Sequence, residues 1–266
     1  MPHPALTIHN PQSAVSKSQS LRLLLSSPAS GPYNMALDEL LLRQARDPAS
    51  TPVLRLYSWQ PATLSLGYFQ PFAEAALFAD RHRLPVVRRL TGGAAIVHQN
   101  ELTYSLAVPV GHPLARAPRQ IYRLVHEALI LALGRCGVRL QRRGYGAADG
   151  ASSPPGWLCF HRADPDDLVV AGRKIAGSAQ RRSAGAVLQH GSVLLAAADA
   201  TPNVPGLREL TGRRLELADL SPLVAAEVSA AVGAPLVAVE PSDLDQAAVD
   251  ELAGRKYAVP CWTERR

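Results

Sequence analysis

The sequence predicts an α+β fold in which a mixed, largely antiparallel sheet is flanked by helices. Amphipathic segments of helical period alternate irregularly with short segments of alternating polarity, which are typical of strands paired as hairpins. The chain has 266 residues, of which 47% are hydrophobic and 19% charged, so it can bury a substantial core. It has neither a Gly-x-Gly-x-x-Gly fingerprint after the first strand nor a P-loop motif, so dinucleotide-binding and P-loop folds lack support.

Periodicity and chain-breaking residues place the elements along the chain. Residues 119–136 give the longest helical pattern, with apolar side chains on one stripe and glycines at its end. A proline separates the strand-like segments 53–57 and 63–68, which we expect to form a hairpin. Ser242 is expected to open the last helix through a capping arrangement with Asp245. The predicted strands are 21–25, 53–57, 63–68, 85–89, 95–97, 102–108, 168–170 and 186–195, and the predicted helices are 34–45, 73–82, 119–136, 222–232 and 244–257.

The polar N-terminal segment and the hydropathy of the chain predict its domain organisation. Residues 1–20 are polar and lack the apolar stretch of a signal peptide, so we expect a disordered tail there and a single domain over residues 21–266. No apolar run approaches the roughly 18 residues that a membrane span needs. The expected location is the cytoplasm, without a membrane partner.

The charge of the chain limits its partners. The formal net charge is +6 and the pI is near 9.5, which suits an acidic partner such as nucleic acid or an acidic carrier protein. No run of basic residues is interleaved with aromatic residues, as a nucleic-acid platform would require. We therefore do not expect nucleic acid to be the partner.

Lysine is rare in this chain, and one lysine lies in a segment rich in small residues. Only three of the 28 basic residues are lysines, and Lys174 directly follows an arginine. Lysine is a compact ammonium whose pKa shifts readily when it is desolvated, whereas arginine is a rigid fork that stays charged. The neighbouring Gly177 and Ser178 would let a ligand approach the backbone closely. We hypothesise that Lys174 belongs to a reaction centre; the alternative is a surface lysine in a turn.

The three cysteines are too widely spaced to suggest a disulfide framework or a zinc site. Cys159 lies fifteen residues before Lys174, just after the Gly- and Ser-rich loop 144–156. If the loop folds back, the ammonium would lower the thiol pKa from about 8.5 toward neutrality and produce a nucleophile. The alternative is that Cys159 is a small buried hydrophobic residue. Cys136 is expected in the core, and Cys261 is treated as incidental because chain termini are often mobile.

A second candidate segment joins a strand to a glycine pair. Arg89 ends the predicted strand 85–89, and Gly92 and Gly93, which follow Thr91, expose backbone N–H groups. Such a turn can cradle an acyl carbonyl, a phosphate or a pantetheine arm. The segment is therefore a candidate substrate-binding loop, although tight turns also use glycine pairs for purely structural reasons.

Two histidines accompany these segments. His98 follows the glycine turn, and His190 precedes Gly191 in the predicted strand 186–195. Each could line a pocket or be a structural histidine whose ring nitrogens are hydrogen bonded. A metal site built from the pair would lack a third ligand, so no metal is expected.

Four segments, in the same order along the chain, resemble the lipoate–biotin protein ligase and acyltransferase superfamily. The resemblance extends from about residue 21 to residue 195. The segments that carry it are 63–70, 88–98, 101–105 and 172–180, the last followed by 188–191. It implies a biotin-protein-ligase-like α+β catalytic domain, which would make residues 21–266 one acyltransferase domain.

Within that superfamily the chain resembles octanoyltransferases of the LipM type. These have Cys-Phe in a loop, then a hydrophobic strand, then Gly-Arg-Lys-Ile-Ala-Gly-Ser-Ala-Gln, and Cys159 and Lys174 fall on those positions. The resemblance implies that Cys159 is the nucleophile that forms an acyl thioester and that Lys174 lowers its pKa. The residues expected to bind substrate are Arg89, Thr91, Gly92, Gly93, His98, Gly177, Ser178 and His190.

The resemblance also implies a reaction. An octanoyl group would pass from octanoyl-acyl carrier protein, through Cys159, to a lysine of a lipoyl domain, such as glycine cleavage H protein or 2-oxoacid dehydrogenase E2. The two steps would follow a ping-pong order. They would need neither ATP nor a metal, because conversion of a thioester to an amide is downhill.

Three alternatives stay open. An ATP-dependent lipoate or octanoate ligase would use Lys174 and the glycine pair equally well but does not need Cys159. A lipoyl-domain amidotransferase would use the same cysteine with a different donor, and a non-catalytic carrier-binding protein would keep the fold without the chemistry. The chain departs from many ligase relatives in having Ala94 where they have a third glycine, and residues 144–155 resemble no family segment.

Overall fold

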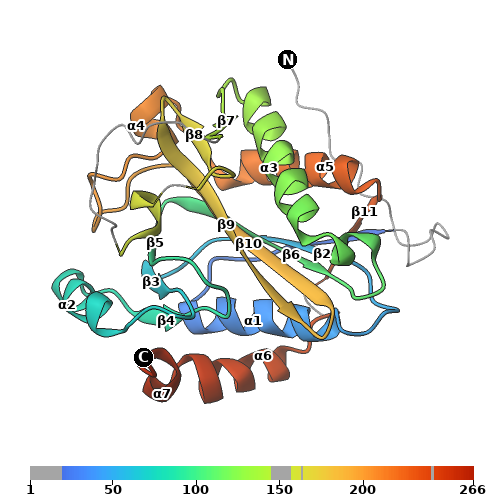
Figure 1. Ribbon diagram of the computed structural model, residues 1–266, viewed down its shortest axis with the longest axis horizontal. Coiled ribbons are helices and arrows are strands. Elements are labelled where there is room, and N and C mark those ends of the chain that lie inside the picture. The colour runs from blue at the N-terminus through green and yellow to red at the C-terminus, as the bar shows by residue number, and fades with distance from the viewer. Residues whose placement is uncertain (1–19, 145–156, 163, 241–242) are drawn as a thin grey trace.

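The computed structural model shows a large sheet with helices on both faces and a smaller sheet at one end (Figure 1). It describes residues 20–144, 157–162, 164–240 and 243–266. The predicted N-terminal tail and most of the predicted loop 144–156 lie outside the described residues. The predicted α+β class, with a mixed and largely antiparallel sheet, is confirmed.

The large sheet has the strand order β11-β1-β2-β6-β10-β9-β8-β7. Strand β1 pairs in parallel with both of its neighbours, and every other adjacent pair is antiparallel. Strand β9 and the short edge strands β7 and β11 were not predicted: the segment of β9 was expected to be a turn, and β7 and β11 are each only two or three residues long, too short to show a period. The strands are β1 (Leu21–Leu25), β2 (Val53–Tyr57), β6 (Glu101–Val108), β7 (Gln141–Arg142), β8 (Leu168–Val170), β9 (Arg173–Ser183), β10 (Ala186–Leu194) and β11 (Leu236–Ala238).

The small sheet has the order β4-β3-β5, formed by β3 (Thr63–Leu66), β4 (Val86–Arg88) and β5 (Ile96–His98). The predicted hairpin between 53–57 and 63–68 is wrong, because these strands belong to different sheets. Both edges of β2 are already paired, with β1 on one side and β6 on the other. All five residues of β2 are buried, so the chain leaves the large sheet before it forms β3.

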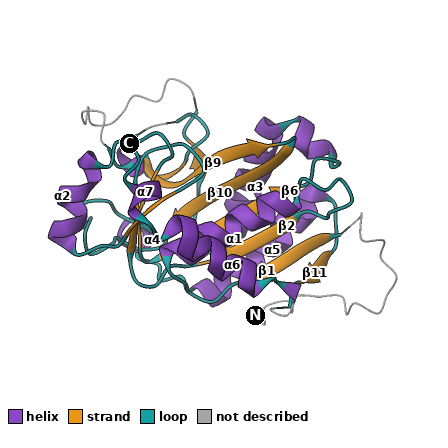
Figure 2. Ribbon diagram, turned by 90° about the horizontal axis from the view of Figure 1, so that it is seen from below, coloured by secondary structure: helices purple, strands orange, loops and turns teal. Residues whose placement is uncertain are grey.

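Helices cover both faces of the large sheet (Figures 1 and 2). Helices α3 and α5 pack on one face, and α1 and α6 lie on the other. The helices are α1 (Gly31–Gln44), α2 (Ala73–His82), α3 (Pro118–Arg135), α4 (Leu207–Thr211), α5 (Leu217–Val232), α6 (Gln246–Leu252) and α7 (Pro260–Thr263), with 3-10 turns η2 (Pro113–Arg116) and η3 (Cys159–His161) and a π turn η5 (Ala253–Tyr257).

Helix boundaries differ from the prediction where buried residues extend a helix. Helix α5 begins five residues before Pro222, so this proline lies inside the helix and the buried Leu220 precedes it. Helix α6 is capped by Asp245, whose side chain accepts a hydrogen bond from the backbone N–H of Ala248 at 3.0 Å. The predicted cap, Ser242, lies outside the described residues.

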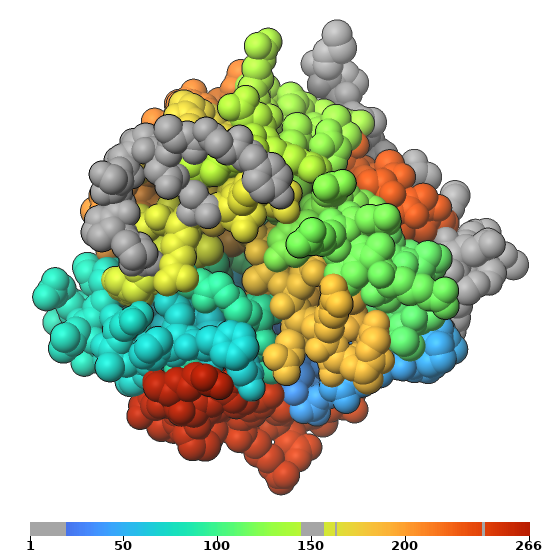
Figure 3. All heavy atoms as spheres, in the orientation of Figure 1, coloured from blue at the N-terminus to red at the C-terminus, as the bar shows by residue number. Residues whose placement is uncertain are grey.

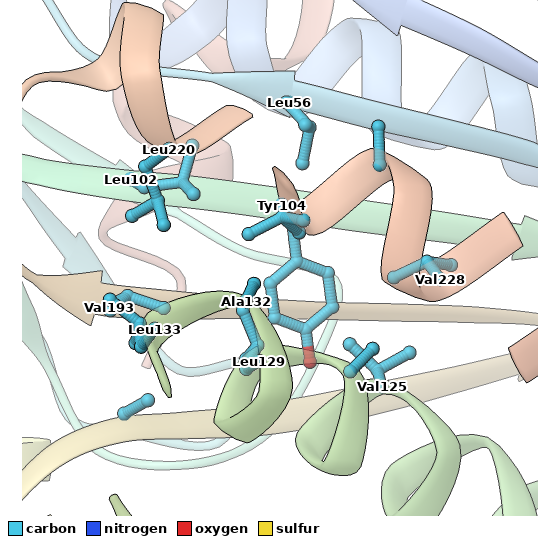
Figure 4. Packing of buried hydrophobic residues seen from close by; sticks show 14 of the residues in the cluster. Leu56, Leu102, Tyr104, Val125, Leu129, Ala132, Leu133, Val193, Leu220 and Val228 are labelled. Atoms are coloured by element: carbon cyan, nitrogen blue, oxygen red, sulfur yellow. The ribbon is translucent and has the colours of Figure 1, made fainter. Parts of the chain in front are cut away.

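The main hydrophobic core lies between β6 and its neighbouring strands and the helices α3 and α5. Figure 4 shows Tyr104 on β6 packed among side chains such as Leu129 of α3 and Val228 of α5. The apolar stripe predicted for 119–136 is confirmed, except that Leu124 is only partly buried. Cys136, predicted to be in the core, caps α3 and is only partly buried against the cluster.

The C-terminal segment packs against the small sheet. The guanidinium of the buried Arg88, on β4, donates hydrogen bonds from Nε and Nη2 to the carbonyl of Thr263 at 2.9 and 2.7 Å. Trp262 Nε1 donates to the carbonyl of Arg88 at 2.9 Å. The expectation of a mobile terminus is therefore wrong, because these bonds fix the last helix. Of the helices that the structure describes, none is long and apolar enough to cross a membrane.

Candidate active site

A cavity opens where the two sheets meet. It encloses about 430 Å³ of empty space, its open mouth included, and its lining is mainly apolar. In Figure 3 the surface is hollowed where the small-sheet region (teal), the segment after residue 157 (yellow) and the β9–β10 hairpin (gold) meet. The predicted site residues that line the cavity are Arg89, Gly92, Gly93, His98, Cys159, Gly177, Ser178 and His190.

Cys159 is held in place by the small sheet. Its backbone N–H donates to the carbonyl of Ala95 at 2.7 Å, and the N–H of Ala95 donates to the carbonyl of Trp157 at 3.0 Å. Leu158, between them, is buried and forms a parallel bridge with Ala95. Cys159 then opens η3 and is itself partly exposed at the cavity. The alternative of a fully buried cysteine therefore does not hold.

Lys174 lies behind Cys159, on the large sheet. The turn expected at Lys174 lies earlier, at Ala171 and Gly172, which have φ of 48° and 75°, and Lys174 is the second residue of β9. Its ammonium Nζ is 2.9 Å from Oδ1 of Asp167 and 3.6 Å from Sγ of Cys159. It also donates to the carbonyl of Cys159 at 3.3 Å. The lysine is buried, so it is not the surface residue of the alternative prediction.

Burial and neighbouring charges act in opposite directions on the Lys174 ammonium. Burial alone would lower the pKa of Lys174, but the charges of Cys159 and Asp167 outweigh it and raise this pKa above its usual value. The side chain therefore stays a cation at neutral pH. Gly177 makes room for it, because a Cβ at that position would lie 2.8 Å from Cε of Lys174.

The glycine turn is supported from behind by Arg89. This buried guanidinium donates from Nη1 to the carbonyl of Ser65 at 2.9 Å and from Nη2 to the carbonyls of Gly92 and Ala94 at 3.1 and 3.0 Å. Burial lowers the pKa of Arg89 to about 10, so it stays charged at neutral pH. The terminal nitrogens of Arg89, a residue expected to bind substrate, are thus bonded to Ser65 of β3 and to the glycine turn.

The backbone N–H groups of Gly92 and Gly93 are available to a ligand. Within the described residues no hydrogen bond uses either group, and both glycines line the cavity. Gly93 has φ of 88°, a conformation that favours glycine. The turn can therefore donate hydrogen bonds to a carbonyl oxygen on which negative charge develops.

His98 and His190 are both structural as well as cavity-lining. His98 is bonded at Nε2 to Oγ of Ser65 at 2.6 Å and at Nδ1 to the carboxylate of Glu101. Its ring stacks on Trp59, with ring centroids 3.9 Å apart. Burial lowers the pKa of His98 more than Glu101 raises it, which favours the neutral ring. Both ring nitrogens of His98 are thus bonded to protein groups, and the residue lines the cavity.

His190 connects Thr91 to a buried ionic network that the sequence analysis missed. Its Nε2 lies 2.5 Å from Oγ1 of Thr91, and its Nδ1 lies 3.3 Å from Oδ2 of Asp38. Asp38, on α1, also accepts from Arg55 Nη1 at 2.9 Å and from the hydroxyl of Tyr57 at 2.9 Å. Arg55, at the centre of the apolar strand 53–57, could have indicated this network from the sequence, because a buried arginine needs a carboxylate as its partner.

Burial would raise the pKa of Asp38, but the hydrogen bond to His190 and the charge of Arg55 outweigh it and hold this pKa below its usual value. Asp38 is therefore an anion in the interior.

Ser178 contacts a second buried polar group, formed by Tyr104, His126 and Gln189. The sequence analysis assigned these three residues no role: Tyr104 and Gln189 lie in segments that carry the family resemblance, and His126 lies in a segment identified by its apolar stripe.

A thiol beside a buried ammonium, at the edge of an apolar cavity, is a suitable arrangement for a nucleophile, because a neighbouring cation favours the thiolate and a thiolate can attack an acyl group. The fold matches that of a putative lipoate protein ligase from Thermoplasma acidophilum, with a TM-score of 0.72. That likeness covers 93% of this chain and 99% of the other at 21% identity, so it shows the fold alone. The chain therefore has the fold of that lipoate protein ligase.

The family model of the lipoyl protein ligase A/B catalytic domain matches residues 30–202, and the chain belongs to this family. Octanoyltransferase LipM from Bacillus subtilis is 39% identical over 183 residues, which are 66% of this chain and 66% of that protein, just under two thirds of its length. Octanoyltransferase LipM from Moorella thermoacetica is 34% identical over 268 residues, covering 91% of this chain and 97% of that protein. The predicted resemblance is confirmed.

Proposed function

We propose that this protein is an octanoyltransferase of lipoate biosynthesis, which passes an octanoyl group through a thioester on Cys159. The observation that carries the proposal is the 3.6 Å separation between Sγ of Cys159 and the buried ammonium of Lys174. It is supported by the 34% and 39% identity to proteins named octanoyltransferase LipM. The proposed donor is octanoyl-acyl carrier protein, and the proposed recipient is a lysine of a lipoyl domain, here called the target lysine.

In the first step the Cys159 thiolate attacks the carbonyl carbon of the octanoyl thioester. The Lys174 ammonium, at 3.6 Å, stabilises the thiolate, as a neighbouring cation does. The free N–H groups of Gly92 and Gly93 stabilise the oxyanion of the tetrahedral intermediate. The carbon–sulfur bond to the carrier then breaks, and the carrier thiolate leaves and takes up a proton. The apolar lining of the cavity suits the eight-carbon tail.

In the second step the amine of the target lysine attacks the acyl group on Cys159. A carbon–nitrogen bond forms, the carbon–sulfur bond to Cys159 breaks with the electron pair on sulfur, and the proton that nitrogen loses passes to the departing Cys159 sulfur. An amide is more stable than a thioester, so neither step calls for ATP or a metal. A net charge of +6 suits an acidic carrier protein as the donor.

One experiment separates the candidate functions. Pure protein is incubated with octanoyl-carrier protein without ATP, and its intact mass is measured. We expect an octanoyl adduct that Cys159→Ser abolishes and that Cys261→Ser, a change at an exposed cysteine, leaves intact. If no adduct forms and activity requires ATP and free octanoate, the protein is a ligase. An adduct formed only from an octanoylated lipoyl domain would identify an amidotransferase, and no chemistry at all would leave a carrier-binding protein.

A further inference from the structure

An aromatic side chain lies exposed beside the mouth of the cavity. Phe69 follows β3 in the connection to α2, and 66% of its surface is exposed. A Cβ on Gly92, which lines the cavity, would lie 4.0 Å from Cδ2 of Phe69. The backbone N–H of Tyr68 donates to the carbonyl of Thr91 at 2.8 Å, so this segment is fixed to the glycine turn. Single exposed apolar residues are common, so the surroundings of Phe69 decide whether it marks a binding surface.

Three arginines from two other parts of the chain surround this segment. The guanidinium carbon of Arg265 lies 3.9 Å from the ring centroid of Tyr68, and that of Arg266 lies 5.3 Å from the ring centroid of Phe69. Arg181, on β9, lies 5.1 Å from the Tyr68 ring. In Figure 3 the C-terminal segment (red) and the β9–β10 hairpin (gold) both border the small-sheet region (teal). We call these five residues the mouth patch.

Strand β9 connects the mouth patch to the wall of the cavity. Arg181 lies two residues after Ala179, which lines the cavity, and alternate residues of a strand face the same side of a sheet. Leu188, the partner of Arg181 on β10, packs in the cluster formed with α1. Arg181 therefore lies on the α1 face of the large sheet, the same face as the wall of the cavity.

The positive charge of the mouth patch is not neutralised within the part of the chain that the structure describes. None of its three arginines forms an ion pair there, and the exposed Glu264, next to Arg265 in the sequence, pairs with none of them. A hydrogen bond and the charge of Arg265, with the charges of Arg181 and Arg266, hold the pKa of Tyr68 below its usual value. The patch thus combines arginine with aromatic rings, a composition typical of the centres of protein interfaces.

The position and charge of the patch indicate which substrate it binds. The thioester of the proposed donor must pass the glycine turn to reach Cys159, so the body of the carrier protein rests at the mouth. An acidic carrier protein presents carboxylates, and its pantetheine arm is attached through a phosphodiester. Arginine binds both kinds of anion through paired N–H groups.

We propose that the mouth patch docks the octanoyl-carrier protein during the first step. Phe69 packs against an apolar part of the carrier surface, and Arg181 and Arg266 pair with its anionic groups. Arg265 is stacked between the rings of Tyr68 and Trp262, at 3.9 and 4.0 Å, and supports the patch from behind. This inference rests on the proposed function and assigns the patch to the donor and not to the lipoyl domain.

The first test reverses the charge of the two outer arginines, in Arg181→Glu with Arg266→Glu. Acylation of Cys159 is measured with octanoyl-carrier protein and with octanoyl-pantetheine, which has the thioester without the phosphate or the carrier body. We expect kcat/KM for the carrier to fall by at least about tenfold, mainly through KM, and that for octanoyl-pantetheine to stay within about twofold. Added salt should slow the reaction of the carrier with the wild type more than with the variant, because salt screens the attraction.

The matched control makes the same change of charge elsewhere. Arg139 and Arg213 are exposed, and Arg213 lies against Gly137 at the C-terminal end of α3. Arg139→Glu with Arg213→Glu should leave both reactions within about twofold of the wild type, because exposed charges farther apart than about 10 Å are largely screened. A comparable loss in the control would mean that the net charge, and not the mouth patch, governs the carrier reaction.

The second test removes the exposed ring. In Phe69→Ala we expect kcat/KM for the carrier to fall by about tenfold, since truncation of an aromatic residue at the centre of an interface is costly, whereas octanoyl-pantetheine reacts as before. Leu131→Ala, which truncates an exposed apolar residue on α3, is the control and should change neither reaction. Normal reaction with octanoyl-pantetheine also shows that each variant is folded.

Three results would overturn the proposal. Unchanged reaction with the carrier in both patch variants would show that it docks elsewhere. Equal losses with the carrier and with octanoyl-pantetheine would mean that these residues act on the cavity itself. Transfer from the isolated acyl-enzyme to a lipoyl domain should be normal in both variants; a loss there, equal to or larger than that in acylation, would assign the patch to the lipoyl domain.

A binding measurement separates this proposal from the proposed function. The Kd of fluorescently labelled carrier protein is measured by anisotropy for the wild type and the charge-reversal variant, and we expect it to rise by at least about tenfold in the variant. This readout needs no acyl-enzyme. Failure of the wild type to form an acyl-enzyme would refute the proposed function, whereas equal Kd values would refute the docking surface.

Discussion

Lys174 is a charged residue in the interior because its neighbours supply negative charge close by. Asp167 lies 2.9 Å from the ammonium, and the Cys159 sulfur lies at 3.6 Å. A lysine in a chain whose basic residues are almost all arginines indicated an unusual position, and the burial of Lys174 supports that hypothesis. The acidic partner, Asp167, was not predicted, because nothing in the sequence shows which carboxylate β8 and β9 bring beside the lysine.

A lysine-to-arginine change tests whether a compact ammonium is needed. In Lys174→Arg the planar guanidinium is larger than the ammonium and cannot take its compact place between Asp167 and Cys159 at the same distances. We expect acyl-enzyme formation to slow by about 100-fold, measured by the time course of the intact mass. Lys256→Arg is the matched control, since Lys256 pairs with Glu39 at 2.6 Å far from the cavity; a comparable loss there would point to a general effect on folding.

The buried His126 should make stability depend on pH. In the folded state its pKa is about 4, whereas in the unfolded chain it is about 6.5. Between these values the unfolded state binds more protons, so the free energy of unfolding rises with pH and is lost as pH falls from 7 toward 4. We expect this residue to contribute a loss of about 3 kcal/mol over that range. Urea unfolding at several pH values should show a smaller loss in His126→Gln, and equal losses would assign the effect to other groups.

At the scale of elements, the cavity depends on a strand that has a glycine where most strands have a side chain. Gly177 of β9 faces the Lys174–Asp167 pair, and a Cβ there would lie 2.8 Å from Cε of Lys174 and 3.0 Å from Oδ1 of Asp167. We expect Gly177→Ala to displace the ammonium and slow acylation by at least about tenfold, as measured by intact mass.

Gly134→Ala is the matched control for that change. Gly134 lies in α3, where an added Cβ would meet no atom within 4 Å. Alanine is the better helix former by about 1 kcal/mol, so this variant should be at least as stable as the wild type and acylate at the same rate. If Gly177→Ala acylates as fast as Gly134→Ala, close packing of the ammonium is not needed for the reaction.

The success of the sequence prediction varied with the kind of element. The stripe on 119–136 was predictable because one face of α3 packs on the sheet and the other meets water, which imposes a period on the sequence. The prediction of a hairpin at Pro61 was wrong, because β2 pairs with β1 and β6, and these pairings depend on residues far away in the chain. The pairing of Cys159 with Lys174 was predicted through the family resemblance. The polar group that contacts Ser178 was not predicted, because its members come from different elements, far apart in the chain, and form no local motif: Tyr104 is on β6, His126 on α3 and Gln189 on β10.

At the scale of the whole molecule, the C-terminal segment and the glycine turn are coupled through β4. The guanidinium of Arg88 donates hydrogen bonds to the carbonyl of Thr263, near the C-terminus. It also donates to the carbonyls of Gly67 and Gln70, beside the turn, at 2.9 and 2.7 Å. This buried arginine therefore holds the base of the turn and the last helix together. The terminus that the sequence analysis set aside is part of the support of the candidate site.

Removal of residues 260–266 tests this coupling. The Arg88 guanidinium would lose its bonds to Thr263 while the rest of its surroundings stay buried, so we expect the free energy of unfolding to fall by at least about 2 kcal/mol. Urea unfolding measures the change. In a chain that carries Arg88→Met, the same truncation should cost clearly less, and an equal cost in both backgrounds would show that the two are independent.

The topology has a consequence for how the site is assembled. Strands β2 and β6 are antiparallel neighbours whose register ends at Tyr57 opposite Thr103, so a tight turn could have joined them. The chain instead makes an excursion between those two residues, and this excursion contains the entire small sheet and the glycine turn. The lysine belongs to the host sheet, while the turn and the anchor of the cysteine belong to the insert. The small sheet, the glycine turn and the anchor of Cys159 thus lie in one connection between two strands that pair with each other without it.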